Sequence, residues 1–175
     1  MPKKAETLIK EGGKKVLHEL LKDSSQSVNV IAKKLGFSRQ KVWRVIKQLE
    51  KNNTIWGFTA VVNEKKIGQK SYMVLIRRTT EPLSEELTSK IIKRNIEPAA
   101  KKLGVVIDSS FYVHGIYDWI ICFSAEDIAD AKHFGDILLR TYPGHIADLQ
   151  ILETLFWIKK HGVTNPEKEK LKEFL

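Results

Sequence analysis

The chain has 175 residues, of which 42% are hydrophobic and 29% charged, as in a folded soluble protein of one or two domains. No apolar run approaches the roughly 18 residues that a membrane span needs, and Met1-Pro2-Lys3-Lys4 leads into no signal-peptide core, so we expect a cytoplasmic protein without membrane contact. Residues 1–62 contain 13 Lys and Arg against 5 Asp and Glu, a net charge of +8, whereas residues 63–175 carry +1.

Two short helices are predicted near the start of the chain. Apolar residues at positions 16, 17, 20 and 21 share one helical face after the breaker Gly12-Gly13. Ser27 is a preferred N-cap, and it precedes a second apolar stripe over residues 28–35. Gly36 can take the left-handed conformation that ends this second helix.

A third helix follows almost at once. Ser38 is its predicted N-cap, and it extends from Arg39 to about Lys51. Two helices joined by so short a turn through a glycine are typical of a helix-turn-helix. The β-prone residues 55–62 then predict a wing strand, with Gly57 inside it.

The outward face of the third helix holds the candidate DNA-binding residues. At about 100° per residue, Gln40, Arg44 and Lys47 lie opposite the apolar stripe. Arg suits guanine, Gln suits adenine and Lys suits a phosphate. Trp43 lies on the flank, where it contacts DNA or belongs to the small domain's own core. The predicted set is Ser38, Arg39, Gln40, Trp43, Arg44 and Lys47. Binding of DNA by this face would explain the net charge of +8 on residues 1–62. A lysine-rich surface that only contacts solvent would carry the same charge.

The second half of the chain predicts the element order β-α-β-β-α-β. The expected strands lie at 71–78, 105–113, 118–123 and 146 to about 158, with a turn at 114–117. A long helix is expected after Pro82, which Pro98 should kink or split near Glu97 and Gly104 should end, and a second helix is expected with Ser124 as its cap. This order is that of a ferredoxin-like sandwich, with helices on one face of an antiparallel sheet. The other face is also apolar, which predicts a homodimer; further assembly to an octamer stays open.

The fold class predicted for the whole chain is therefore α+β. The expected layout is a DNA-binding domain at 1–62, a linker at 63–70, a sandwich at 71–160 and a tail at 161–175. The tail should start a short helix near Asn165, which either docks or frays.

No residue pattern points to catalysis. The five histidines have no i, i+3 or i+4 partners among themselves, so no helix presents a metal pair. Cys122 lies in an apolar strand and cannot form a disulfide or a cysteine-based zinc site within the chain. No phosphate-binding glycine loop is present. We therefore predict no catalytic residues, no metal and no cofactor.

The chain resembles the Lrp/AsnC, or feast/famine, family of transcription regulators along nearly its whole length. The matching positions are Val16-Leu17, Leu20, Asp23, Ser27, Ile31-Ala32, Leu35-Gly36, Ser38, Val42, Ile46, Leu49-Glu50, Ile55, Gly57-Phe58, Asn63, Gly68, Gly115-Ile116-Tyr117-Asp118 and Pro143-Gly144. Each match is weak alone, but together they occur in the family's order and spacing. The resemblance implies a sandwich of the type called RAM in that family.

The resemblance also implies a small-molecule effector site at Gly115, Tyr117 and Asp118, because such proteins bind effectors, often amino acids, near this hairpin. Asp118 would pair with an ammonium group. The same residues also suit a purely structural role, with Gly115 in the turn and Asp118 accepting from turn amides. Both readings stay open.

The function predicted from the sequence is a sequence-specific regulator that binds double-stranded DNA and responds to an amino-acid-like effector. One alternative is a nucleoid-type architectural protein with weak sequence preference. Another is an enzyme with a regulatory sandwich, which the lack of a catalytic constellation disfavours.

Overall fold

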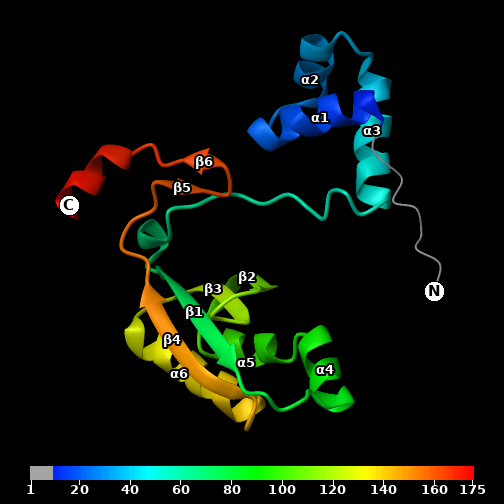
Figure 1. The fold of residues 1–175 in the computed structure, drawn as a ribbon. Coiled ribbons are helices and arrows are strands. Elements are labelled where there is room, and N and C mark those ends of the chain that lie inside the picture. Colours follow the sequence, from blue (N-terminus) through cyan, green and yellow to red (C-terminus); the bar gives the residue numbers. More distant parts are fainter. Residues whose placement is uncertain (1–9) are drawn as a thin grey trace. The chain divides into compact units, whose positions relative to one another are not determined.

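The computed structural model describes residues 10–175, and the chain divides into two compact units. The first comprises the described residues up to Val61 together with Lys159–Thr164, and the second comprises Val62–Ile158 and Asn165–Leu175. Figure 1 shows the helices of the first unit and the sheet with its helices in the second. Within residues 10–175, no helix is both long and apolar enough to cross a membrane.

Three helices build the first unit: α1 (Glu11–Lys22), α2 (Val28–Leu35) and α3 (Arg39–Lys51). Their apolar faces meet in a small core, which the partly buried Phe37 of the α2–α3 turn and Ile55 complete. The fully buried members are Val16, Ile31 and Val42. Each helix thus contributes one side chain with no solvent contact, which fixes the rotation of α3 about its axis.

Two expectations for this unit are wrong. Gly12 and Gly13 do not precede α1 but form part of its first turn, where Gly13 is buried and a Cβ on Gly12 would lie 3.8 Å from the Phe37 ring. The wing strand expected at 55–62 is also absent from the described chain, because these residues are extended but pair with no other strand. A β-prone sequence becomes a strand only when another strand offers it hydrogen bonds.

The second unit is built on a four-stranded antiparallel sheet in the order β2-β3-β1-β4. The strands are β1 (Lys70–Arg78), β2 (Val106–Tyr112), β3 (Trp119–Ala125) and β4 (Ile146–Glu153). The central pair β1–β3 runs in an unbroken register from Lys70 opposite Ala125 to Ile76 opposite Trp119. This strand order, with its two crossover helical segments, is the predicted ferredoxin-like arrangement.

Three helices pack on one face of this sheet: α4 (Glu85–Ile92), α5 (Ile96–Lys102) and α6 (Ile128–Thr141). The core lies between the helices and inward residues of the central strands, such as Val74 and Ile121. Helix α6 lies close to β4, since a Cβ on Gly135 would come within 3.1 Å of Ile151. Phe134 and Leu138 of α6 are fully buried.

Several helices and strands begin or end at other residues than predicted. The helix after Pro82 is split into two, as the prediction allowed, but the break lies at residues 93–95 rather than near Glu97. Pro98 stands in the first turn of α5, where a missing N–H costs little. Ser124 belongs to β3, and Asp127 caps α6 by accepting from the backbone N–H groups of residues 129 and 130. Strand β4 ends at Glu153, five residues before the predicted end.

A short helix was expected near Asn165, but the hairpin that precedes it was not. A short hairpin forms from β5 (Lys159–Lys160) and β6 (Val163–Thr164), followed by the 3-10 helix η2 (Lys168–Glu173). Beyond η2, the Phe174 ring lies 5.5 Å from the Phe156 ring. Lys65, in the 3-10 helix η1 (Glu64–Ile67), lies over the Phe174 ring at 5.7 Å. The end of the chain therefore docks on its own unit.

Candidate nucleic-acid interface

The turn between α2 and α3 consists of Gly36 and Phe37 and is held by local hydrogen bonds. Gly36 has φ 63°, the left-handed conformation that glycine adopts without a Cβ penalty. The Ser27 side chain accepts from Val30 N–H, and the Ser38 side chain accepts from Lys41 N–H at 3.2 Å. The predicted caps are thus confirmed, and together they set the angle at which α3 leaves the turn.

The outward face of α3 is the surface that the helical wheel predicted. Val42 and Leu49 are buried, whereas Gln40, Arg44 and Lys47 are exposed on the opposite side. Arg39 and Ser38 are exposed at the helix start. Five of the thirteen α3 residues are Lys or Arg and one is Glu, so this face has a strong positive charge.

The side chains on this face differ in whether they already contact another residue. Within residues 10–175, the Arg44 side chain has no hydrogen-bond or ion-pair partner, whereas Lys47 Nζ lies 2.7 Å from Glu50 Oε2. Trp43 is 54% exposed and stands outside the core cluster, so the alternative that it belongs to the small core is wrong. Lys41, which the sequence analysis passed over, has its ammonium 3.6 Å from the Phe37 ring centroid.

Besides Glu50 on α3, the best-paired acidic residue of this unit is Glu19 on α1. Glu19 on α1 is nearly buried, with Lys22 Nζ at 2.8 Å and Lys34 Nζ at 3.3 Å from its oxygens. Hydrogen bonds from these two ammonium groups hold the pKa of Glu19 below its ordinary value. The Lys34 pair links α2 to α1, and the Lys22 pair lies within α1.

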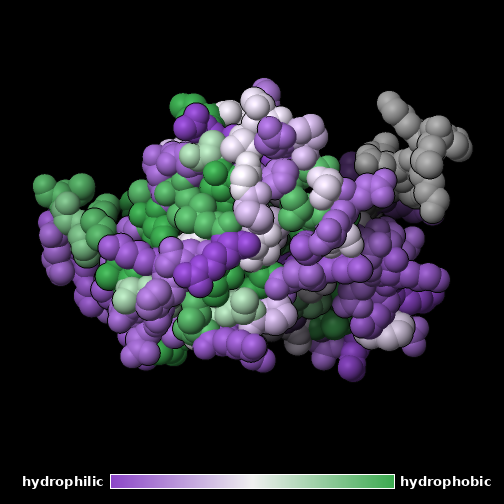
Figure 2. Space-filling model, turned by 90° about the horizontal axis from the view of Figure 1, so that it is seen from below, coloured by the Kyte–Doolittle hydropathy of each residue, from purple (hydrophilic) through white to green (hydrophobic). Residues whose placement is uncertain are grey.

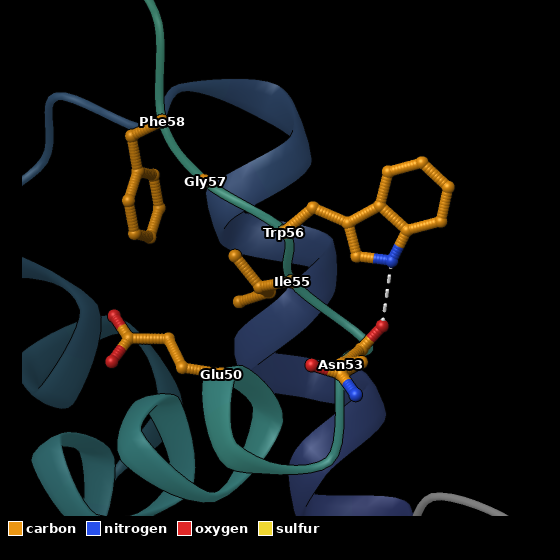
Figure 3. A pocket seen from close by; sticks show the side chains of 6 residues that line it. All are labelled: Glu50, Asn53, Ile55, Trp56, Gly57 and Phe58. Atoms are coloured by element: carbon orange, nitrogen blue, oxygen red, sulfur yellow. Dashed lines mark hydrogen bonds between the residues drawn. The ribbon is translucent and has the colours of Figure 1, made fainter. Parts of the chain in front are cut away.

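A hollow of about 460 Å³ lies beside the end of α3. Its lining residues are Glu50, Asn53, Ile55, Trp56, Gly57 and Phe58. Figure 3 shows Trp56 pointing away from Glu50 and Phe58, with its indole N–H donating to the Asn53 carbonyl at 2.8 Å. Trp56 is 94% exposed, whereas residues 55–62 were expected only to form a wing strand. A tryptophan two residues after the polar turn sequence Asn52-Asn53-Thr54 is the signal that could have drawn attention to it.

The hairpin between β2 and β3 contains the candidate effector residues. Asp118 Oδ2 accepts from the Arg78 backbone N–H at 2.8 Å, and the Tyr117 hydroxyl donates to Gln150 Oε1 at 2.9 Å. Gly115 is exposed, has no left-handed φ, and a Cβ there would meet nothing within 4 Å. The turn geometry therefore does not require glycine at this position, while Asp118 already performs a structural task.

Among residues 10–175, no cluster of three or more His, Cys, Asp or Glu side chains could hold a metal ion. The described chain does present a basic helix face on α3 and an exposed hairpin between β2 and β3.

Comparisons with known proteins agree with this geometry. A family model described as winged helix-turn-helix DNA-binding matches residues 13–55. The HTH-type transcriptional regulator LrpA of Pyrococcus horikoshii is 41% identical over 61 residues, which are 35% of this chain and 43% of LrpA. The matched stretch thus spans less than half of that curated relative.

Solved structures match over nearly the whole chain. An AsnC family transcriptional regulator from Agrobacterium tumefaciens has a TM-score of 0.63 at 23% identity, covering 95% of this chain and 100% of its own. A transcriptional regulator of Neisseria meningitidis in complex with L-Met has a TM-score of 0.66 at 16% identity, covering 96% and 100%. At these identities, the matches establish a shared fold.

A helix-turn-helix with a basic outward face, joined to a ferredoxin-like sandwich, defines the class of two-unit helix-turn-helix proteins. The match to LrpA is a sequence match over 61 residues, whereas the whole-chain structural matches concern the fold. The chain is thus similar in sequence to one Lrp-type transcription regulator over part of its length, and it shares the fold of solved Lrp and AsnC family regulators.

Proposed function

We propose that the protein is a sequence-specific regulator that binds double-stranded DNA through α3 and is not an enzyme. The observation that carries this proposal is the outward face of α3, where Gln40 and Arg44 are exposed in a segment matched by a DNA-binding model. A helix inserted in the major groove presents such side chains to base edges. The net charge of +8 on residues 1–62 supplies attraction to phosphates.

Each α3 residue has a distinct proposed role. Arg44, free of partners within residues 10–175, reads a guanine edge, and Gln40 reads a neighbouring base. Lys47 leaves Glu50 to contact a phosphate. At the helix start, Ser38 keeps its capping bond while Arg39 faces the backbone of the DNA. Trp43 packs on a sugar or a thymine methyl at the flank.

We further propose a homodimer formed through the outer face of the sheet. Cross-strand register places a row of apolar side chains on the face opposite the helices, and these are Met73, Leu75, Phe111, Ile120, Cys122 and Leu152. Phe111 and Leu152 are exposed in a single chain. Broad hydrophobic areas between hydrophilic ones are visible on the surface in Figure 2. A second copy would cover apolar area of this kind and supply a second DNA half-site.

This interface has a direct test. Leu152→Lys places a charge on the outer sheet face, and Leu139→Lys places the same charge on α6 at similar exposure. Light scattering of the full chain should show a dimer for the wild type and for Leu139→Lys, and a monomer for Leu152→Lys. A monomeric wild type, or a dimeric Leu152→Lys, would contradict the proposed interface.

The effector site is proposed at Gly115, Tyr117 and Asp118. Its support is the exposure of the hairpin, together with one carboxylate oxygen of Asp118 that the Arg78 bond leaves available. An amino-acid-like ligand would place its ammonium there. The structural neighbour from Neisseria meningitidis is a complex with L-Met, which accords with such a ligand class. Residues 1–62 would then read DNA and residues 71–160 would sense the ligand, joined by 63–70 and followed by the tail at 161–175.

The experiment that tests the function is selection of duplexes from a random pool by the full chain. The enriched duplex should bind at least roughly a thousandfold tighter than a scrambled one at physiological salt, and both affinities should fall steeply as salt rises. Equal affinity for both duplexes would favour a nucleoid-type protein instead. Absence of binding to either duplex would refute the proposed function.

A further inference from the structure

The second unit contains a cavity of about 200 Å³ on the helix side of the sheet, separate from the effector hairpin. It lies where the corner between α4 and α5 meets strand β2 at the edge of the sheet. The residues around it are Ile91, Arg94, Ile96, Glu97, Ile107, Ser110, Tyr112, Trp119 and Tyr142. A space of this size is smaller than the roughly 300–1,000 Å³ of drug-sized sites and larger than the roughly 150 Å³ that holds a benzene ring.

Three aromatic rings give the cavity flat walls. Tyr112 and Trp119 stack with centroids 5.6 Å apart and planes 6° apart, and Tyr142 meets Trp119 edge-on at 5.5 Å. The Trp119 indole N–H donates to Ser110 Oγ at 2.9 Å, which holds the indole in place. A planar apolar body could pack against such walls without rearranging them.

Most polar groups around the cavity can donate a hydrogen bond. Burial raises the pKa of Tyr142 to about 12 and raises that of Tyr112, so both hydroxyls keep their protons at neutral pH. Ser110 Oγ accepts from Trp119 and keeps its own proton to donate. The Glu97 carboxylate is the acidic group on the rim, and Arg94 already pairs with it. This excess of donors suits a ligand that carries an anionic acceptor.

Arg94 occupies a backbone position that favours glycine. It follows α4 with φ 54°, and glycine fills the left-handed positions after α2 and α5, at Gly36 and Gly104. A bulky residue in this conformation is strained and needs compensation from its surroundings. Arg94 uses Nε and one terminal nitrogen for Glu97 Oε1, so its other terminal nitrogen is available at the mouth of the cavity.

We propose that this cavity is a binding site for a small aromatic monocarboxylate, with the ring against Tyr112, Trp119 and Tyr142 and the carboxylate on Arg94. The site is independent of the proposed DNA-binding role. Its position at the base of the β2–β3 hairpin, where Tyr112 pairs with Trp119, would place a bound ligand next to that hairpin.

The test uses phenylacetate as the probe and phenylacetamide as its uncharged match, with the full chain. Phenylacetate should shift the indole NMR signal of Trp119, which Trp119→Phe identifies by its loss, and should bind at least roughly tenfold tighter than phenylacetamide. Equal binding of the two probes, or no shift of the Trp119 signal by phenylacetate, would overturn the proposal.

Arg94→Gly separates binding from folding. Glycine relieves the left-handed backbone, so the variant should melt at a higher temperature than the wild type. It should nevertheless bind phenylacetate at least roughly tenfold more weakly and bind phenylacetamide as the wild type does. Arg94→Lys, which keeps a cation, should recover part of the loss. If the stable Arg94→Gly variant binds phenylacetate with unchanged affinity, the cavity does not select a carboxylate.

Discussion

Asp118 allows the structural and the ligand-binding roles of the β2–β3 hairpin to be separated by two substitutions. Its carboxylate accepts from the Arg78 backbone N–H at 2.8 Å, at the point where the β1–β4 register shifts between Arg77 and Arg78. The carboxylate therefore supplies an acceptor where the strand ladder is irregular. Asp118→Ala removes this acceptor, whereas Asp118→Asn keeps an oxygen of the same reach and removes the charge.

The expected costs follow from this one bond. A hydrogen bond to a charged acceptor contributes about 1.5–3 kcal/mol, and partial exposure of Asp118 places its value near the lower end. Asp118→Ala should therefore lower the free energy of unfolding by about 1.5 kcal/mol, a loss of several degrees in melting temperature for a domain of this size. Asp118→Asn should cost less than about 1 kcal/mol.

The assay combines urea unfolding of the full chain with DNA affinity measured in the presence of whichever of the twenty amino acids raises the wild-type melting temperature. Asp118→Asn should fold and bind effector-free DNA as the wild type does, but it should lose the response to the effector. A folded Asp118→Asn that still responds would refute the effector assignment. If Asp118→Asn costs as much stability as Asp118→Ala, the hydrogen-bond reasoning is wrong.

Two further predictions concern the first unit. Ser38→Ala and Ser27→Ala each remove an N-cap and should each cost about 1 kcal/mol in urea unfolding, but only Ser38→Ala should also weaken DNA binding, because it loosens the start of α3. Equal DNA affinities for the two variants would contradict a role for the α3 start. The lowered pKa of Glu19 means that its ion pairs stabilise the fold above its ordinary value of 4.5 and that this stability is lost as pH falls through the lowered pKa. Acid unfolding should show that loss in the wild type but not in Glu19→Gln, and identical pH profiles would disprove it.

Local chemistry explains what could be predicted of the fold. The caps Ser27 and Ser38 and the left-handed Gly36 depend only on neighbouring residues, so the sequence contains all the information that they need. The phase of α3 follows from its apolar period, and Arg44 is exposed as that period requires. The βαββαβ order likewise follows from elements that are each locally marked.

The predictions that were wrong concern residues whose conformation depends on distant partners or on an unusual backbone angle. Residues 55–62 look like a strand, but no described strand pairs with them. The hairpin β5–β6 turns through His161, with φ 46°, and Gly162, with φ 83°, and histidine is a weak turn signal. Arg94 likewise takes a conformation that its residue type does not suggest.

The candidate sites likewise differ in whether neighbouring or distant residues form them. The outward residues of α3 come from one continuous helix and could be predicted together. The cavity walls Tyr112, Trp119 and Tyr142 come from separate elements, and only the folded sheet brings them together. The ion pair of Lys47 with Glu50 follows from their i,i+3 spacing on one helix, whereas the contact of Lys41 with the Phe37 ring depends on the folded turn between α2 and α3.

The central claim is that the outward face of α3 reads base sequence, and base-preference profiling of Arg44→Ala against Lys47→Ala tests it most directly. Arg44→Ala should lose about 1–3 kcal/mol of affinity for the selected duplex and relax the preference at one base pair. Lys47→Ala should weaken all duplexes alike and lower the salt slope by about one unit. An unchanged affinity and base preference in Arg44→Ala would show that α3 does not read DNA through this face.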